Sequence, residues 1–495
     1  MPDATIIPFE LPLPQVLPTI EGNVDYRQFR DQLLHIDSLL VSSGLETRLM
    51  QKDLQRWLGQ RKKVSAKAQQ NHQRHCRRAL RCNIARGLIQ EDYRGLAARL
   101  ADSPLLQRFC GLSEVLCITV PSKTTLQRYD AWWPQAEIRH VVNELLALGA
   151  AAPQSLALPE AVDLESAFVD TTCLAANIHY PVDWVLLRDA TRTLMKAVQL
   201  IRGQGLKHRM EPPQSFLTRI NRLCIQMTHT SSKTDTQRHR KKTLRQMEKL
   251  VGTVGNHARR YRDVLNQDWK QTQWTEAQAQ QVLRRMDRVL EQLPPARQQA
   301  RQRILQGQPV ANAEKILSLY EPDVHVIVRK KAGAEVEFGN TLLLAENPQG
   351  LILDWELFKE SAPADAGLLP RTVGRMEQAY GPKLKAVAGD RGFDSLSNRL
   401  GLAEDGIYNA VCPRAPEQLR QRSGSWKFKR LQRRRAQIEG RLSIVKNVFL
   451  SGRVRSKGFT HRERTVTWTV LVHNLWVLAR MQLRAEAAQR QAQAA

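Results

Sequence analysis

Two short apolar runs in this chain each end at an aspartate, and the two aspartates lie 220 residues apart. Ala386–Gly389 leads into Asp390 and then turns through Gly392, whereas Ala167–Val169 leads into Asp170. A short apolar run that stops at a turn is typical of a buried strand, and ligands bind at the carboxyl edge of open α/β sheets. One aspartate before glycine is also an ordinary turn. Two such strand ends predict a site for a cation.

Composition restricts the partners of this site. The chain has 495 residues, of which 42% are hydrophobic and 25% charged, as expected for a globular protein of two to four domains. Its formal charge of +27 favours a polyanion, and nucleic acid over membrane. The most apolar late stretch, 466–479, is interrupted by polar residues and is shorter than the ~20 residues of a spanning helix. Residues 1–18 lack the features of a secretion signal, so we expect a cytoplasmic, nucleoid-associated protein without membrane contact.

The seven cysteines are scattered and lack any C-x-x-C pair, which predicts reduced thiols. A small cluster is formed by His72, His75, Cys76 and Cys82. It has two interpretations, a metal site or part of a solvated basic helix.

The first part of the chain is expected to be helical. Residues 1–45 are interpreted as a loosely packed N-terminal arm, and 46–150 as a helical DNA-binding domain. Ser122 is a good cap for a helix that carries Lys123, Gln127 and Arg128. Short helices with a late basic one fit a helix-turn-helix-like reader of DNA, and a plain helical domain with a basic exterior fits equally well.

A long polar and helical block, 184–305, follows the first aspartate. Part of it is strongly basic and includes Arg240, Lys241 and Lys242. A solvated helix face accounts for some of these charges, but the sustained bias of one sign favours a surface that faces nucleic acid.

Without this block, the order of elements from Phe168 is strand, strand, strand, helix, strand, helix, strand, helix. This order is ribonuclease-H-like. It predicts an α+β or α/β domain, formed by 160–183 and 320–455, with a mixed five-stranded sheet and flanking helices. The helical block is then a large insertion after the first strand, and 456–495 is a C-terminal helical segment. In such a fold, acids are expected on the first strand, on the fourth strand and on the last helix, which we place within Trp426–Leu450.

Glu439 is the candidate for the third acid. Between Arg420 and Arg464 there are fifteen Lys or Arg residues and only two acids, so this carboxylate does not serve solubility. On a regular helix, Arg435, Glu439 and Lys446 lie within about 40° of one another. The alternative is an ordinary Arg-Glu pair with an unrelated lysine.

Three carboxylates within about 5 Å would repel by about 3 kcal/mol per pair at an effective dielectric constant of 20. Divalent cations between them remove this cost. Oxygen ligands without a Cys or His cage favour Mg²⁺ or Mn²⁺. Two such ions activate a water or a DNA 3′-hydroxyl for in-line phosphoryl displacement. Arg435, Lys446 and Arg391 are the candidates for holding DNA phosphates nearby.

These residues resemble the DDE transposases of bacterial insertion sequences. The similarity rests on Asp170-Thr171-Thr172, on the Asp-x-Gly-Phe element 390–393, and on the spacing Arg435-(3)-Glu439-(6)-Lys446. The last resembles the Tyr-Arg-Glu-Lys signature of several groups, with the ISNCY-like group as a candidate, except that Gln432 occupies the tyrosine position. The helical region 93–112 is also similar, so the resemblance covers roughly residues 75–480.

The resemblance implies that Asp170, Asp390 and Glu439 are the catalytic metal ligands, for two Mg²⁺ or Mn²⁺ ions. It implies magnesium-dependent cleavage at the terminal repeats of an insertion sequence, then strand transfer, by a homodimer or larger assembly on double-stranded DNA. The alternatives are a related nuclease that does not join ends, and a DNA-binding regulator or domesticated transposase without catalysis.

Overall fold

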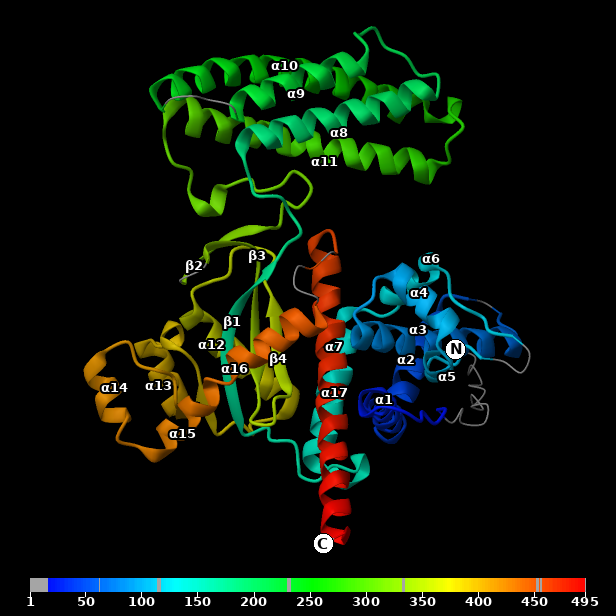
Figure 1. Ribbon diagram of the computed structural model, residues 1–495, viewed down its shortest axis with the longest axis vertical. Coiled ribbons are helices and arrows are strands. Elements are labelled where there is room, and N and C mark those ends of the chain that lie inside the picture. The colour runs from blue at the N-terminus through cyan, green and yellow to red at the C-terminus, as the bar shows by residue number, and fades with distance from the viewer. Residues whose placement is uncertain are drawn as a thin grey trace.

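The computed structural model describes residues 17–61, 63–113, 117–228, 233–331, 334–450, 454 and 456–494 (Figure 1). A mixed β-sheet lies at its centre, with helices on both sides and a lobe of long helices above. The expected mixed α+β architecture is therefore confirmed. The first 16 residues of the expected arm lie outside the described part of the chain.

The N-terminal region is helical: α1 Val24–Ser42, α2 Leu45–Gly59, α3 Ala66–Ile89, α4 Tyr93–Asp102, α5 Pro104–Phe109, α6 Lys123–Asp130 and α7 Gln135–Ala151. Local capping explains several starts, because the Ser65, Asp92, Ser103 and Ser122 side chains accept backbone N–H groups of α3 to α6. The expectation of a loosely packed arm is wrong for α1, which buries Leu33 and Ile36 completely.

The sheet has six strands in the described residues: β1 Ser166–Ala175, β2 His325–Lys331, β3 Ala334–Glu346, β4 Ile352–Leu357, β5 Ala386–Ala388 and β6 Tyr408–Asn409. β1, β3 and β4 pair antiparallel, whereas β5 runs parallel to β1 and β6 parallel to β5. Read from β4, the order is β4-β3-β1-β5-β6, which is compatible with a ribonuclease-H-like fold.

The expected number of five strands is wrong, because β3 has two partners along one edge. Gly339 pairs with Ala175 of β1 on one side and with His325 of β2 on the other. Farther along β3, Leu342 pairs with Thr172 of β1 and with Leu357 of β4. β2 and β4 therefore share the same edge, and the 13 residues of β3 provide room for both.

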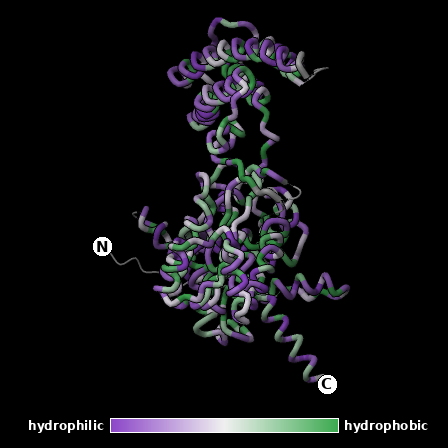
Figure 2. The backbone as a smooth tube through the Cα atoms, turned by 90° about the vertical axis from the view of Figure 1, so that its left-hand side faces the viewer, coloured by the Kyte–Doolittle hydropathy of each residue, from purple (hydrophilic) through white to green (hydrophobic). Residues whose placement is uncertain are grey.

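The block between β1 and β2 forms four long helices: α8 Asp183–Gly203, α9 Pro213–Thr228, α10 Lys233–Asp268 and α11 Glu276–Ala300, which a π-helical turn, Arg301–Gln306, continues. These helices bury their own hydrophobic cluster, which includes Leu194, Met247 and Met286. Figure 2 shows them as a lobe joined to the larger body by thin connections.

Six further helices surround the sheet: α12 Asp365–Tyr380, α13 Leu396–Glu404, α14 Pro416–Arg422, α15 Trp426–Arg435, α16 Ile438–Ser443 and α17 Phe459–Ala494. α12 and α17 contact β4, α16 contacts β1, and α15 contacts β5. The single last helix expected within Trp426–Leu450 is wrong. The chain turns at Ala436 and Gln437 between α15 and α16, and continues after α16 as a π-helical turn, Ile444–Phe449.

The N-terminal helices and the sheet share one hydrophobic core. α17 runs through it, with α1, α3 and α7 on one side and the sheet on the other (Figure 1). In the described residues, no helix combines the length and the apolar character needed to cross a bilayer.

Candidate active site

Asp170 lies on β1, and Asp390 lies at the matching position two residues beyond the end of the neighbouring parallel strand β5. Phe168 of β1 pairs with Ala388 of β5, and each aspartate follows two residues after its member of this pair. Because side chains two residues apart on a strand point to the same face, both carboxylates leave the same face of the sheet. The register of β1 against β5 thus brings together two aspartates that are distant in sequence.

Backbone N–H groups fix both carboxylates. Asp170 Oδ1 accepts the N–H of Thr171 at 2.7 Å. Asp390 Oδ1 accepts the N–H of Gly392 at 2.8 Å and so caps the short helical turn Arg391–Phe393. Within the described part of the chain, the Oδ2 atom of each aspartate makes no hydrogen bond and is left for another partner.

The other charged groups of this site act on Asp170. Burial and, next, the negative charge of Asp390 raise the pKa of Asp170, whose net value is about 6. The Thr171 N–H and the Arg435 guanidinium lower the pKa of Asp170, and Glu439 adds a smaller upward contribution. The predicted carboxylates and Arg435 therefore form one electrostatic cluster, although they come from β1, the turn after β5, α15 and α16.

Glu439 reaches this cluster by a different route from the one expected. The turn between α15 and α16 breaks the regular helix, so the expected spacing of about 40° for Arg435, Glu439 and Lys446 does not apply. Glu439 lies in the first turn of α16 and is exposed, whereas Ile438 and Leu442 of the same helix are buried. α16 therefore packs by its apolar face and leaves the Glu439 carboxylate accessible.

The basic residues near the acids divide into two kinds. Lys446 Nζ lies 3.4 Å from Thr172 Oγ1, on the same face of β1 as Asp170. Arg434, in contrast, is structural. Its guanidinium contacts Glu346 at 2.9 Å, donates to the carbonyls of Asn347 and Pro348, and lies over the Phe168 ring.

Gln432, at the position expected for a tyrosine, joins α15 to the sheet. Its Nε2 donates to the carbonyl of Gly389 at 3.1 Å and also to the carbonyl of Ala410. Gly389 immediately precedes Asp390, so this side chain helps to hold the end of β5 in place.

Sequence reasoning missed Asp365. This carboxylate opens α12 and accepts the Thr171 hydroxyl at 3.1 Å through Oδ1. A Cβ added to Gly392 would lie 2.5 Å from Asp365 Oδ2 and 2.9 Å from Asp390 Oδ1. Asp365 therefore reaches both acid-bearing segments, and the glycine of Asp-x-Gly-Phe permits this approach. Nothing in the sequence separates Asp365 from an ordinary acid at a helix N-terminus.

The donor set suits a hard divalent cation. Asp170, Asp390 and Glu439 supply only oxygens. Burial, together with the charges of Asp390 and Glu439, raises the pKa of Asp170, and a bound cation would remove this cost of ionisation. As the side chains lie, no three Asp, Glu, His or Cys groups of the described residues are close enough together to enclose an ion. The His and Cys cluster of α3 was the other candidate metal site. Its histidines are engaged in hydrogen bonds within the N-terminal helices, because His72 bonds Asp53 and His75 bonds Tyr129.

The remaining candidates lie apart from the acids. Lys123, Gln127 and Arg128 are exposed on α6. The first two line a cavity of about 640 Å³ between α3, α4 and the beginning of α17. Arg391 is exposed beside Asp390.

On α10, Lys242 is exposed and Lys241 half-buried. Arg240 is engaged within the insertion, because its Nε donates to the Met227 carbonyl at 3.2 Å and its guanidinium lies over the Trp184 ring.

Residues 328–475 match the family model of the transposase DDE domain. This match supports a DDE-type transposase. The matched segment begins in β2, ends within α17, and contains Asp390 and Glu439 but not Asp170, which lies before the insertion. No curated protein and no solved structure matched the chain.

Proposed function

We propose that this protein is a transposase that binds the terminal repeats of an insertion sequence and catalyses DNA cleavage and strand transfer. The observation that carries the proposal is the register of β1 against β5, which places Asp170 and Asp390 side by side on one face of the sheet. The family match over the second part of the same domain supports it independently of that geometry.

In this function Asp170, Asp390 and Glu439 hold two divalent ions, Mg²⁺ or Mn²⁺. When bound, such ions activate a water or a DNA 3′-hydroxyl and neutralise charge on the phosphate that is attacked. The chain itself orients the ligands. The Thr171 and Gly392 N–H groups fix one oxygen of each aspartate, and Gln432 holds the backbone before Asp390.

Basic side chains around the acids bind the substrate. Arg435 acts on Asp170, Lys446 lies beside Thr172, and Arg391 is exposed next to Asp390. We assign these three to phosphates of the DNA, because Arg and Lys contacts position the backbone without reading its sequence. Exposed Lys123, Gln127 and Arg128 of α6 are assigned to the terminal repeats. Lys241 and Lys242 are assigned to a further DNA-facing surface, without Arg240, which is bonded within the insertion. The protein would act in the cytoplasm on nucleoid DNA, as a homodimer or larger assembly.

The test compares acid variants with a matched control. Asp170→Asn, Asp390→Asn and Glu439→Gln are each expected to abolish Mg²⁺-dependent cleavage of DNA that carries the coding region with its flanks. Binding of the same DNA should remain nearly unchanged, because the amides keep the shape of the acids. Glu463→Gln is the control, since Glu463 is the other acid of the basic segment 420–464 and contacts Thr467 only through its backbone carbonyl.

The result separates the competing functions. Cleavage that persists in one acid variant removes that residue from the site, and cleavage that persists in all three refutes the proposed chemistry. Cleavage by the wild type without joining of precut ends to a target indicates a nuclease. Binding without any cleavage by the wild type indicates a regulator.

A further inference from the structure

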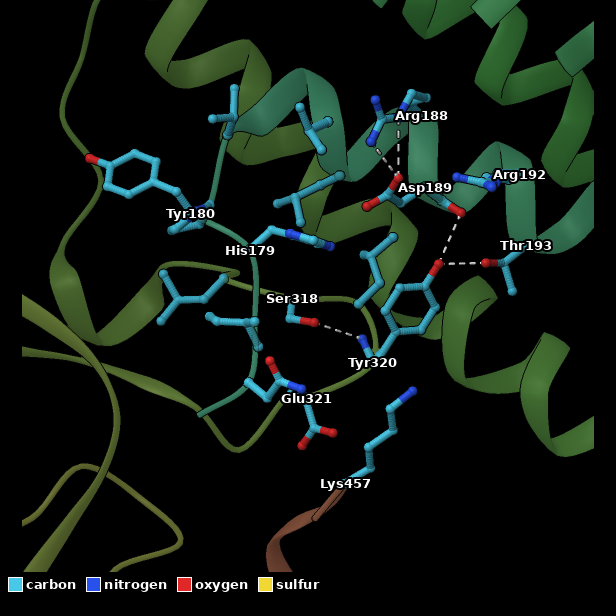
Figure 3. Close-up of a pocket in the computed structure, with 18 of the residues that line it drawn as sticks. His179, Tyr180, Arg188, Asp189, Arg192, Thr193, Ser318, Tyr320, Glu321 and Lys457 are labelled. Atoms are coloured by element: carbon cyan, nitrogen blue, oxygen red, sulfur yellow. Dashed lines mark hydrogen bonds and ion pairs between the residues drawn. The ribbon is translucent and has the colours of Figure 1, made fainter. Parts of the chain in front are cut away.

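A second basic site lies at the base of the helical insertion. A cavity of about 580 Å³ opens where α8 and α11 meet the segment after β1 and the loop before α17 (Figure 3). Five Lys or Arg side chains line it, against two carboxylates. The cations are Arg188, Arg192, Lys196, Arg285 and Lys457.

Both carboxylates of this cavity already have cationic partners. Asp189 pairs with Arg188 at 3.1 Å, as Figure 3 shows. Glu321 pairs with the buried Arg462 and accepts the N–H of Gly458. The other four cations form no ion pair with any carboxylate of the described residues, and all four are exposed to solvent.

The four cations come from three parts of the chain but line one cavity. Arg192 and Lys196 are four residues apart on α8, so they lie on one strip of that helix, about 6 Å apart along its axis. Arg285 comes from α11, and it acts together with Arg192 on the Tyr320 hydroxyl, where both oppose the rise in pKa that burial causes. Lys457 approaches from the larger body below (Figure 3). Like charges gathered in this way repel one another unless an anion lies between them.

We propose that this cleft binds the sugar-phosphate backbone of double-stranded DNA. Its four cations are exposed and come from α8, α11 and the loop before α17, a spread that suits a polyanion better than a single small anion. Contacts of this kind are independent of base sequence and release counterions from the DNA. The inference extends the proposed function, because it assigns a DNA-contacting role to the insertion at a place that the acid site does not include.

The cleft is within reach of DNA held at the acids. β1 carries Asp170, and its continuation, nine residues later, brings His179 into the cleft wall. Nine residues of chain span at most about 30 Å. This length corresponds to about nine base pairs of duplex, at 3.4 Å for each. The cleft therefore binds the same DNA molecule within about one helical turn of the phosphate that is cut.

The experiment compares two pairs of substitutions in the full chain. Arg192→Ala with Lys196→Ala removes two cations of the cleft. Arg284→Ala with Arg288→Ala is the control, because these residues are also exposed and four apart, but on α11 outside the cleft. Fluorescence anisotropy with long random-sequence duplex DNA is measured in EDTA over a range of salt concentrations, and circular dichroism checks that both variants are folded.

The cleft pair is expected to reduce the slope of log K against log salt by about 2 and to weaken binding about tenfold or more near 0.15 M salt. The control pair should change the slope by less than half as much. Equal DNA binding by the two variants refutes the proposal that the cleft binds DNA. So does binding of inorganic phosphate that only the cleft pair loses while duplex binding is unchanged, since the cleft then holds a small anion.

The outcome is independent of cleavage. If the acid variants still cut DNA while the cleft pair binds DNA weakly, the proposed chemistry is refuted and DNA binding by the cleft is supported. If the acid variants are inactive and the cleft pair binds DNA as the wild type does, DNA binding by the cleft is refuted and the proposed function is supported.

Discussion

Replacing Asp170 by asparagine is expected to stabilise the metal-free protein. Burial and the charge of Asp390 raise the pKa of Asp170 from 3.8 to about 6 in the folded state. A shift of one pKa unit corresponds to about 1.36 kcal/mol, so the ionised carboxylate costs the folded state about 3 kcal/mol. Asparagine keeps the shape and its Oδ1 still accepts the Thr171 N–H, but it carries no charge. The free energy of unfolding should rise by up to this amount.

The gain depends on pH in a defined direction. Because the folded state binds the Asp170 proton more tightly than the unfolded chain, wild-type stability falls as the pH rises from about 4 through about 6. The asparagine variant lacks this loss. The two proteins should therefore differ most above pH 6 and converge near pH 4. Under the proposed function, Mg²⁺ neutralises the carboxylates and should reduce the difference above pH 6.

The measurement is urea unfolding in EDTA at several pH values, repeated with Mg²⁺. Asp394→Asn is the matched control, since Asp394 is 2% exposed and follows closely after Asp390. Burial alone would raise the pKa of Asp394, but Arg399 and the Arg414 N–H lower it below its usual value. The control should lose stability above pH 4. If Asp170→Asn is neutral or destabilising above pH 6 while the control behaves as expected, the ionised Asp170 does not cost the folded state the free energy assigned to it.

Three further substitutions test the packing around the site, each by urea unfolding. Gly339→Ala should cost about 3 kcal/mol or more, because the new Cβ would lie 2.1 Å from the Leu174 carbonyl of β1; a loss below about 1 kcal/mol contradicts this contact. Arg462→Met should cost about 3 to 5 kcal/mol by leaving buried Glu321 unpaired, and the double change with Glu321→Met should restore most of it. Gln432→Ala should cost about 1 to 3 kcal/mol and slow cleavage, and unchanged values would exclude its role in holding β5.

The positions of the two aspartates could be predicted from local sequence, because short apolar runs bounded by turns depend mainly on neighbouring residues. The runs before Asp170 and Asp390 do form β1 and β5. Their register, Phe168 against Ala388, could not be predicted, since it depends on contacts between segments far apart in the chain.

The region of Glu439 was harder for a physical reason. Arg435, Ala436 and Gln437 all favour helix, and no glycine or proline marks the turn between α15 and α16. Tertiary packing therefore decides this break. Gln432 bonds the carbonyls at the ends of β5 and β6, while buried Ile438 directs α16 toward the core. Helical periodicity assumes a continuous axis, so it is no basis for aligning Glu439 with Lys446 here.

The role of α17 also follows from tertiary contacts. The polar residues that interrupt its apolar stretch argue against a membrane span in the sequence, and they have a structural role in the fold. Asn474 is buried, and its side chain both accepts the Ile352 N–H and donates to the Ile352 carbonyl, at 2.9 Å each. It thereby satisfies the backbone of β4 as a neighbouring strand would.

The position of α17 explains why the N-terminal helices and the sheet, expected as separate domains, share one main core. A helix that is apolar on most sides must be buried on most sides. In α17, Val470, Leu471 and Val472 are all fully buried, so the sheet and the N-terminal helices have to cover it together. The helical DNA-binding domain was expected to end near residue 150, where the sequence becomes rich in Ala and Pro, but this connection does not divide the core. α6 and the acid-bearing strands therefore belong to one packed body, and of the predicted DNA-facing segments only the insertion has a core of its own.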